Sequence, residues 1–201
     1  MPTAQILDNT KHRLLETAIE LFHRHGYNGV SVRDIASAVG ITPPALYNHY
    51  PNKKALYRAA IAAAFEDKAL RLLVVLDDSG APMQRLERFL HAATTEVRQS
   101  PEFRCLIERE LLDGDGERLE FLGQTVFARV QRPFMQLLQE LRPGCDAFLL
   151  SEMVFGMLKQ HDSMGLLHPH MDMGIRLTRS PDQIARQVMA VLTPYFTEAE
   201  R

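Results

Sequence analysis

The residues between Arg33 and Lys53 include side chains whose types and spacing suit contacts with a nucleic acid. Arg33 can pair with a guanine through two hydrogen bonds, and Thr42 begins a predicted helix whose free N–H groups can bind a phosphate. The apolar side chains after Thr42 can contact thymine methyl groups, and the hydroxyl, imidazole, amide and ammonium groups beyond them can reach phosphates or bases. The candidate contact residues are Arg33, Thr42, Pro43, Pro44, Ala45, Tyr47, Asn48, His49 and Lys53.

Three short predicted helices position these side chains. The apolar spacing predicts the first helix from Thr10 to His25 and the second from Val32 to Val39. The third begins at Pro43 and ends at Tyr50, because Pro51 follows and the residue before a proline disfavours the α conformation. Gly40 supplies a tight turn between the second and third helices, and this arrangement is typical of a helix-turn-helix.

Some residues in this region have a purely structural explanation. Ser31, Thr42 and Asn52 are expected as helix caps in any helical protein, and Tyr50 is expected to fill the core rather than contact DNA. The caps alone therefore predict helices. Their combination with the aromatic, imidazole and ammonium side chains named above indicates nucleic-acid binding.

The rest of the chain is also predicted to be helical, with one long connection over residues 164–180 that is expected to be a flap or a mobile loop. Further helices are expected over residues 52–76, 82–99, 101–112, 117–141, 146–162 and 181–196. Pro133 is the expected point of a kink or break in the helix over residues 117–141. The sequence therefore predicts an all-α protein of about nine helices, with a helix-turn-helix domain over residues 1–56 and a larger helical domain over residues 57–201.

Charge is unevenly divided along the chain. The formal net charge is −2, which by itself argues against a general attraction to nucleic acids. Residues 1–60 carry +3, however, and residues 61–201 carry −5. This division predicts a small basic DNA-binding region joined to a larger acidic body.

Several other classes of function have no support in the sequence. It contains no nucleophile elbow, P-loop, dinucleotide fingerprint or HExxH motif, so an enzyme is not expected. It contains no signal-peptide pattern and no membrane-spanning stretch, so a cytoplasmic protein without membrane contact is expected. His161, His168 and His170 do not follow a structural zinc spacing, and Asp113–Glu117 is expected to form a turn rather than a calcium loop, so no metal is expected.

The segment Thr10–Phe65 resembles the N-terminal domain of the TetR family of bacterial transcriptional repressors. The matching residues are Ala18, Phe22, Gly26-Tyr27, Ser31-Val32-Arg33-Asp34-Ile35-Ala36, Val39-Gly40-Ile41 and Leu46-Tyr47-Asn48-His49-Tyr50-Pro51-Asn52-Lys53-Lys54-Ala55-Leu56. The resemblance implies DNA backbone contacts from Ser31, Thr42, Tyr47, His49 and Lys53, and base contacts from Arg33 and Pro43–Ala45.

The same resemblance implies that the larger domain binds an inducer and forms a homodimer through its last two long helices. A dimer is also expected because one short reading helix covers too few base pairs to specify an operator. The expected interface residues are Phe148, Leu149, Val154, Met157, Leu158, Ile184, Val188, Val191, Leu192 and Tyr195. Packing within one chain is the alternative explanation for these side chains.

Methionines and phenylalanines in the C-terminal part are compatible with an adaptable pocket for an apolar or amphipathic small molecule of unknown identity, and no other cofactor is expected. Phe103, Phe127, Met135 and Phe155 are the candidate lining, although core packing would explain them equally well. The predicted function is a small-molecule-responsive repressor that binds a palindromic double-stranded DNA operator. The alternative is a transcriptional activator or a DNA-binding protein without an inducer.

Overall fold

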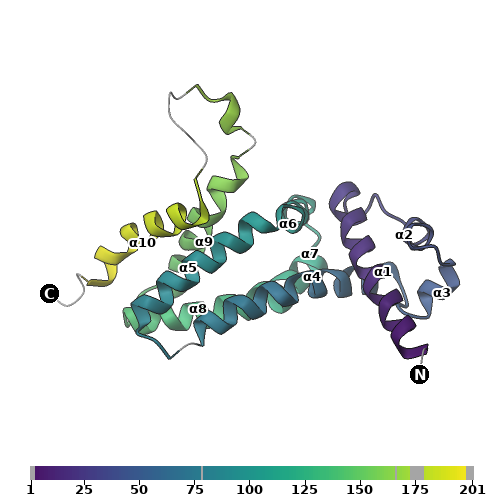
Figure 1. Ribbon diagram of the computed structural model, residues 1–201, viewed down its shortest axis with the longest axis horizontal. Coiled ribbons are helices and arrows are strands. Elements are labelled where there is room, and N and C mark those ends of the chain that lie inside the picture. The colour runs from purple at the N-terminus through teal and green to yellow at the C-terminus, as the bar shows by residue number, and fades with distance from the viewer. Residues whose placement is uncertain (1–2, 78, 166, 173–178, 198–201) are drawn as a thin grey trace. The chain divides into compact units, whose positions relative to one another are not determined.

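The computed structural model describes residues 3–77, 79–165, 167–172 and 179–197, with side chains from Thr10 onward. This part of the chain is helical and contains no strand (Figure 1). The prediction of an all-α protein is confirmed. The helices are α1 (Thr3–His25), α2 (Val32–Val39), α3 (Pro43–Tyr47), α4 (Lys53–Leu76), α5 (Pro82–Gln99), α6 (Pro101–Asp113), α7 (Gly116–Phe121), the π-helical segment η1 (Leu122–Phe127), α8 (Ala128–Leu141), α9 (Ala147–Ser163), the 3-10 segment η2 (His168–His170) and α10 (Pro181–Thr197).

The predicted helix over residues 117–141 is interrupted, but not at the expected place. The interruption is η1, which contains the weak helix formers Gly123 and Thr125. Pro133 instead lies inside α8, in its second turn. The expectation of a break at Pro133 is therefore wrong. The regular α-helix is interrupted earlier, by the π-helical segment η1, and α8 continues through Pro133.

The long connection before α10 is described only in part. It contains η2, whereas residues 166 and 173–178 lie outside the described residues. The prediction of a flap or mobile loop for this connection stays a prediction.

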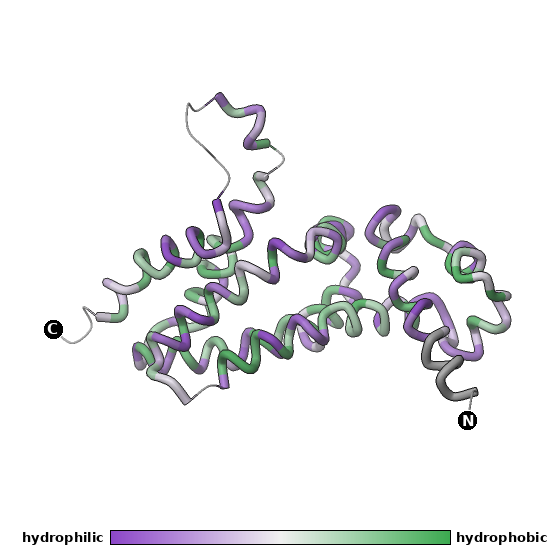
Figure 2. Tube along the Cα trace, viewed as in Figure 1, coloured by the Kyte–Doolittle hydropathy of each residue, from purple (hydrophilic) through white to green (hydrophobic). Residues whose placement is uncertain are grey.

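Local sequence explains why these helices begin and end where they do. Gly26 and Gly40 have φ values of 73° and 78°, the left-handed conformation that ends α1 and α2 and that glycine adopts without steric cost. Hydrophobic and hydrophilic residues alternate along most helices in Figure 2, so each helix has one face suited to a core.

The chain divides into two compact units, and the first contains residues up to Asp67 together with Pro101–Val126. This grouping differs from the predicted boundary at residue 56. The reason is that apolar side chains of α6 and η1, Leu106 and Val126 among them, are buried in the same core as Leu14 and Phe22 of α1. The helix-turn-helix is therefore built on a core that includes a distant part of the sequence.

The second unit contains Lys68–Ser100 and the chain from Phe127 onward. Within it, α10 packs along α5, and α8 packs along α9. Phe89 and Phe134 stack at 4.2 Å between ring centroids, and Phe155 packs edge-on against both rings. None of the helices in the described residues is both long and apolar enough to cross a membrane.

Candidate nucleic-acid interface

The turn between α2 and α3 is closed by backbone hydrogen bonds. The Gly40 N–H donates to the Ser37 carbonyl at 3.1 Å, and the Ile41 N–H donates to the Ala36 carbonyl at 2.9 Å. Leu46 of α3 is fully buried against the apolar face of α2. The two helices are thereby held as the helix-turn-helix that the sequence predicts.

Side-chain caps fix the start of each helix at this site. The Thr42 hydroxyl accepts from the Ala45 N–H at 3.4 Å, and the Asn52 side chain accepts from the Ala55 N–H at 2.8 Å. The Ser31 hydroxyl accepts from the Asp34 N–H at 3.2 Å, and the Asp34 carboxylate accepts from the Ser31 N–H at 2.8 Å, which completes a capping box. These caps make the positions of α2, α3 and the start of α4 well defined.

The predicted DNA contacts all remain accessible on these capped helices. Tyr47 is 49% exposed, and Arg33 projects from the exposed face of α2. Six of the ten predicted residues are exposed, namely Ser31, Arg33, Thr42, Pro44, Tyr47 and Asn48, and four are half-buried, namely Pro43, Ala45, His49 and Lys53. Their contacts with DNA stay predictions, but no predicted contact residue is buried.

Tyr50 has the core position that was expected of it. Its side chain is 6% exposed and belongs to the same apolar cluster as Leu46. Burial raises the pKa of its hydroxyl. Tyr50 therefore packs in the core beside Leu46 of α3 and is not part of the contact surface.

Two adjacent lysines at the start of α4 have different surroundings, which the sequence did not indicate. The Lys53 ammonium lies 4.2 Å from the centroid of the Tyr27 ring. Lys54 instead forms an ion pair with Glu117 of α7, and Arg58 pairs with the same carboxylate at 3.0 Å. The hydrogen bond from Lys54 lowers the pKa of Glu117. The Lys54 ammonium is thus already engaged by a carboxylate within the chain, which it shares with Arg58.

A buried ion pair beneath the helix-turn-helix was also missed at the sequence level. Arg118 is 6% exposed and donates to the carboxylate of Glu110, itself 1% exposed, at 2.5 Å. It also pairs with Asp113 at 3.2 Å and Asp115 at 3.3 Å. The predicted turn in the acidic stretch is confirmed, since Gly114 has a φ of 66°. Asp113 and Asp115 of this stretch hold Arg118, whereas Glu117 pairs with Lys54 and Arg58.

Half of the predicted dimer contacts are buried inside a single chain. Val154, Leu158, Ile184, Val188 and Leu192 are at most 7% exposed. These five residues pack between α9, α10 and neighbouring helices of the same chain, as the alternative explanation expects, and their part in an interface stays a prediction. Phe148, Leu149, Val191 and Tyr195 remain exposed, and Met157 is half-buried.

The predicted ligand-pocket residues are divided between the two units. Phe103 stacks on Phe65 in the first unit at 5.7 Å, and Phe155 packs in the aromatic core of the second unit. Phe127 is 39% exposed, and Met135 is half-buried. The assignment of these four residues to a ligand pocket stays a prediction.

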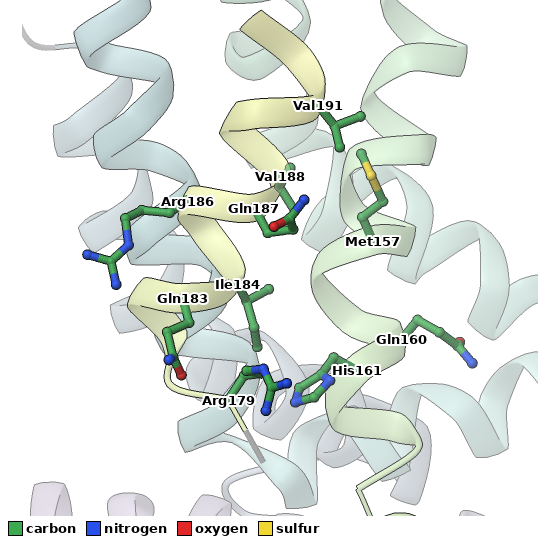
Figure 3. A pocket seen from close by; sticks show the side chains of 10 residues that line it. All are labelled: Met157, Gln160, His161, Arg179, Gln183, Ile184, Arg186, Gln187, Val188 and Val191. Atoms are coloured by element: carbon green, nitrogen blue, oxygen red, sulfur yellow. The ribbon is translucent and has the colours of Figure 1, made fainter. Parts of the chain in front are cut away.

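A groove of about 770 Å³ lies between α9 and α10 instead, and none of the four predicted residues lines it. Figure 3 shows Met157 and Val191 pointing toward each other across it, with His161 and Arg179 close together at the other end. Its remaining lining residues are Gln160, Gln183, Ile184, Arg186, Gln187 and Val188. The lining thus combines an apolar surface with amide and cationic groups.

The histidines at one end of this region are close in space. The rings of His161 and His168 lie 5.0 Å apart, and burial, followed by the charge of His168, lowers the pKa of His161. In the part of the chain that the structure describes, no three histidine, cysteine or acidic side chains are grouped so that they could hold a metal ion.

Replacing Asp34 with asparagine is expected to destabilise α2. Hydrogen bonds from the Ser31 hydroxyl and then from its N–H lower the pKa of Asp34, so the ionised carboxylate favours the folded state. The stabilisation is complete above the ordinary aspartate pKa of about 4 and is lost as the pH falls through the lower folded-state value. Urea unfolding at pH 7 should show a lower midpoint for Asp34→Asn, and the difference should shrink in acid. An equal difference at both pH values would contradict the capping role.

The chain is similar in sequence to proteins of one bacterial regulatory family. Residues 14–60 match the family described as bacterial regulatory proteins, tetR family. The nucleoid occlusion factor SlmA of Shewanella sp. (strain MR-4) is 26% identical over 152 residues, which cover 75% of this chain and 77% of SlmA.

Solved structures share the fold over nearly the whole chain. A transcriptional regulator from Pseudomonas aeruginosa PAO1 has a TM-score of 0.78 at 22% identity, with 95% of this chain and 92% of that chain covered. The regulator FadR from Bacillus subtilis, solved in complex with stearoyl-CoA, has a TM-score of 0.73 at 14% identity, with 90% and 96% covered.

Proposed function

Because this chain belongs to the TetR family of bacterial regulatory proteins and is a DNA-binding transcriptional regulator rather than an enzyme, we propose that it represses transcription in the cytoplasm by binding a palindromic operator as a homodimer. The observation that carries the proposal is the exposed surface of capped helices α2 and α3. Arg33 and Tyr47 lie on this surface, and in the described part of the first unit neither side chain has an ion pair or hydrogen bond that would compete with DNA. Such a surface can enter a major groove with little rearrangement.

Exposed apolar side chains on α9 and α10 support the homodimer. Phe148 and Met153 are each 57% exposed, and Leu149 and Val191 are each 55% exposed. Large apolar side chains grouped on neighbouring helices are typical of a protein interface. A second copy of the chain would cover them and would supply the second reading head that a palindrome requires.

The groove between α9 and α10 supports control by an amphipathic small molecule. Its volume lies within the range of ligand sites, and its lining offers apolar contacts from Met157 and Val191 and polar groups from His161 and Arg179. FadR, which shares the fold, was solved with stearoyl-CoA. A ligand bound preferentially to one conformation of the dimer would change operator affinity.

The similarity to SlmA favours a second candidate function. SlmA is named a nucleoid occlusion factor, and the second candidate is accordingly a DNA-binding protein that acts without an inducer. The two candidates differ in their response to small molecules. Stearoyl-CoA, stearate and a panel of apolar effectors should raise the melting temperature and alter DNA affinity of a sensor, and should change neither in a protein without an inducer.

Replacing Arg33 and Tyr47 with alanine is expected to weaken operator binding strongly. The loss of a bidentate base contact costs about 1–3 kcal/mol in each half-site, and the loss of Tyr47 removes a phosphate contact as well. A duplex selected from a randomised library by the unmodified chain would serve as the ligand, with binding followed by fluorescence anisotropy. Arg132→Ala, on the exposed surface of α8, is the matched control. Unchanged affinity of the double variant would refute this reading face.

A further inference from the structure

Tyr27 lies between the helix-turn-helix and the buried ion pair, and its ring interacts with two cations. The Lys53 ammonium is 4.2 Å from the ring centroid, and the Arg118 guanidinium carbon is 4.6 Å from the same centroid. A cation within about 6 Å of an aromatic face is attracted by the charge distribution of the ring. Tyr27 therefore connects a candidate phosphate-binding lysine to the interior of the unit.

The ring of Tyr27 is held firmly in place. It packs edge-on against Tyr57 at 4.9 Å and lies parallel to Phe22 at 5.9 Å, and both of these side chains are fully buried. Arg118 cannot follow the lysine, because Glu110, Asp113 and Asp115 hold its guanidinium. The ring is thus a fixed platform rather than a mobile neighbour.

Lys53 is in turn restricted by this platform. Lys53 is half-buried, and the pKa of its ammonium is lowered first by burial and then by the charge of Arg118. Repulsion from Arg118 disfavours a position deeper in the unit, while attraction to the ring disfavours free rotation in solvent. A side chain restricted in this way loses less conformational entropy when it binds a ligand.

We propose that Tyr27 is a positioning residue for DNA binding, which holds the Lys53 ammonium ready for a backbone phosphate. Lys54 has no such role, because its ammonium is already paired with Glu117. This inference rests on the proposed DNA-binding function and adds to it a residue that does not contact DNA. It also assigns different roles to two neighbouring lysines.

Anisotropy titrations with the selected duplex test this assignment. Tyr27→Leu, which removes the ring, is expected to weaken binding about 3- to 10-fold per half-site, whereas Tyr27→Phe, which keeps it, should bind like the unmodified chain. Lys53→Ala should reduce the slope of log affinity against log salt by about 0.9 for each lost phosphate contact. Lys54→Ala should leave that slope unchanged.

The double variant distinguishes positioning from general support of the fold. If Tyr27 acts through Lys53, Tyr27→Leu has no further effect on affinity in a Lys53→Ala background, whereas a structural role would give additive losses. Additive losses, or normal binding by Tyr27→Leu, would overturn the inference. Thermal melts of each variant check that it is still folded at the temperature of the binding assay. Failure of the unmodified chain to bind any selected duplex would instead refute the proposed function itself.

Discussion

Replacing Arg118 with methionine is expected to lower the free energy of unfolding by about 3–5 kcal/mol, because it leaves a buried carboxylate without its partner. Glu110 is 1% exposed, and Arg118 donates to it at 2.5 Å. Asp113 and Asp115 would lose the same counter-charge and would repel each other and Glu110. Urea unfolding followed by circular dichroism would measure the loss.

Two further variants make the Arg118 experiment decisive. Arg24→Met removes an exposed ion pair with Glu20 and should change stability by no more than about 1 kcal/mol. Adding Glu110→Leu to Arg118→Met should restore much of the lost stability, because no buried charge then remains unpaired. A loss for Arg118→Met as small as that of Arg24→Met would show that the buried pair contributes little.

Placing a carboxylate at position 191 is expected to convert the proposed dimer into a monomer and to weaken operator binding by about two orders of magnitude. Val191 is 55% exposed in the single chain, so Val191→Asp costs little within the monomer. In a dimer the new charge would be buried without a partner. Affinity falls because linking two half-site contacts raises overall binding by about 10²–10⁴-fold.

Light scattering at micromolar concentration and anisotropy with the selected duplex would measure both effects. Val74→Asp is the matched control, since Val74 is 72% exposed on α4 and lies outside the proposed interface. The control should keep the mass and the DNA affinity of the unmodified chain. A Val191→Asp variant that remains dimeric would exclude this part of α10 from the interface.

The helix-turn-helix could be predicted from the sequence because its determinants are local. Ser31 and Thr42 cap helices a few residues away, and Gly40 ends α2 with a φ of 78° wherever the unit packs. The bounds of α2 follow from these signals, and the structure reproduces them. The exposed positions on α2 and α3 follow from the same helical period, because a face opposite to a buried Leu46 must meet solvent.

The C-terminal predictions were less complete because the burial of an apolar residue depends on which helices pack together. Helical spacing places Val188 and Val191 on α10 equally well, yet one is 5% exposed and the other 55%. The spacing cannot distinguish them, because α5 covers one side of α10 and leaves another open. Local sequence likewise could not indicate the surroundings of the four candidate pocket residues, since nothing local to Phe103 or Phe155 indicates its neighbours.

The sequence by itself determined the helical class, the capped reading helices and the basic character of the N-terminal region, because each depends on residues within a few positions of one another. Tertiary structure alone decided that Arg118 meets Glu110 and Tyr27, that Lys54 pairs with Glu117, and that the Lys53 ammonium lies over the Tyr27 ring. These pairings join segments up to about ninety residues apart, and the free energy of packing a common core selects them.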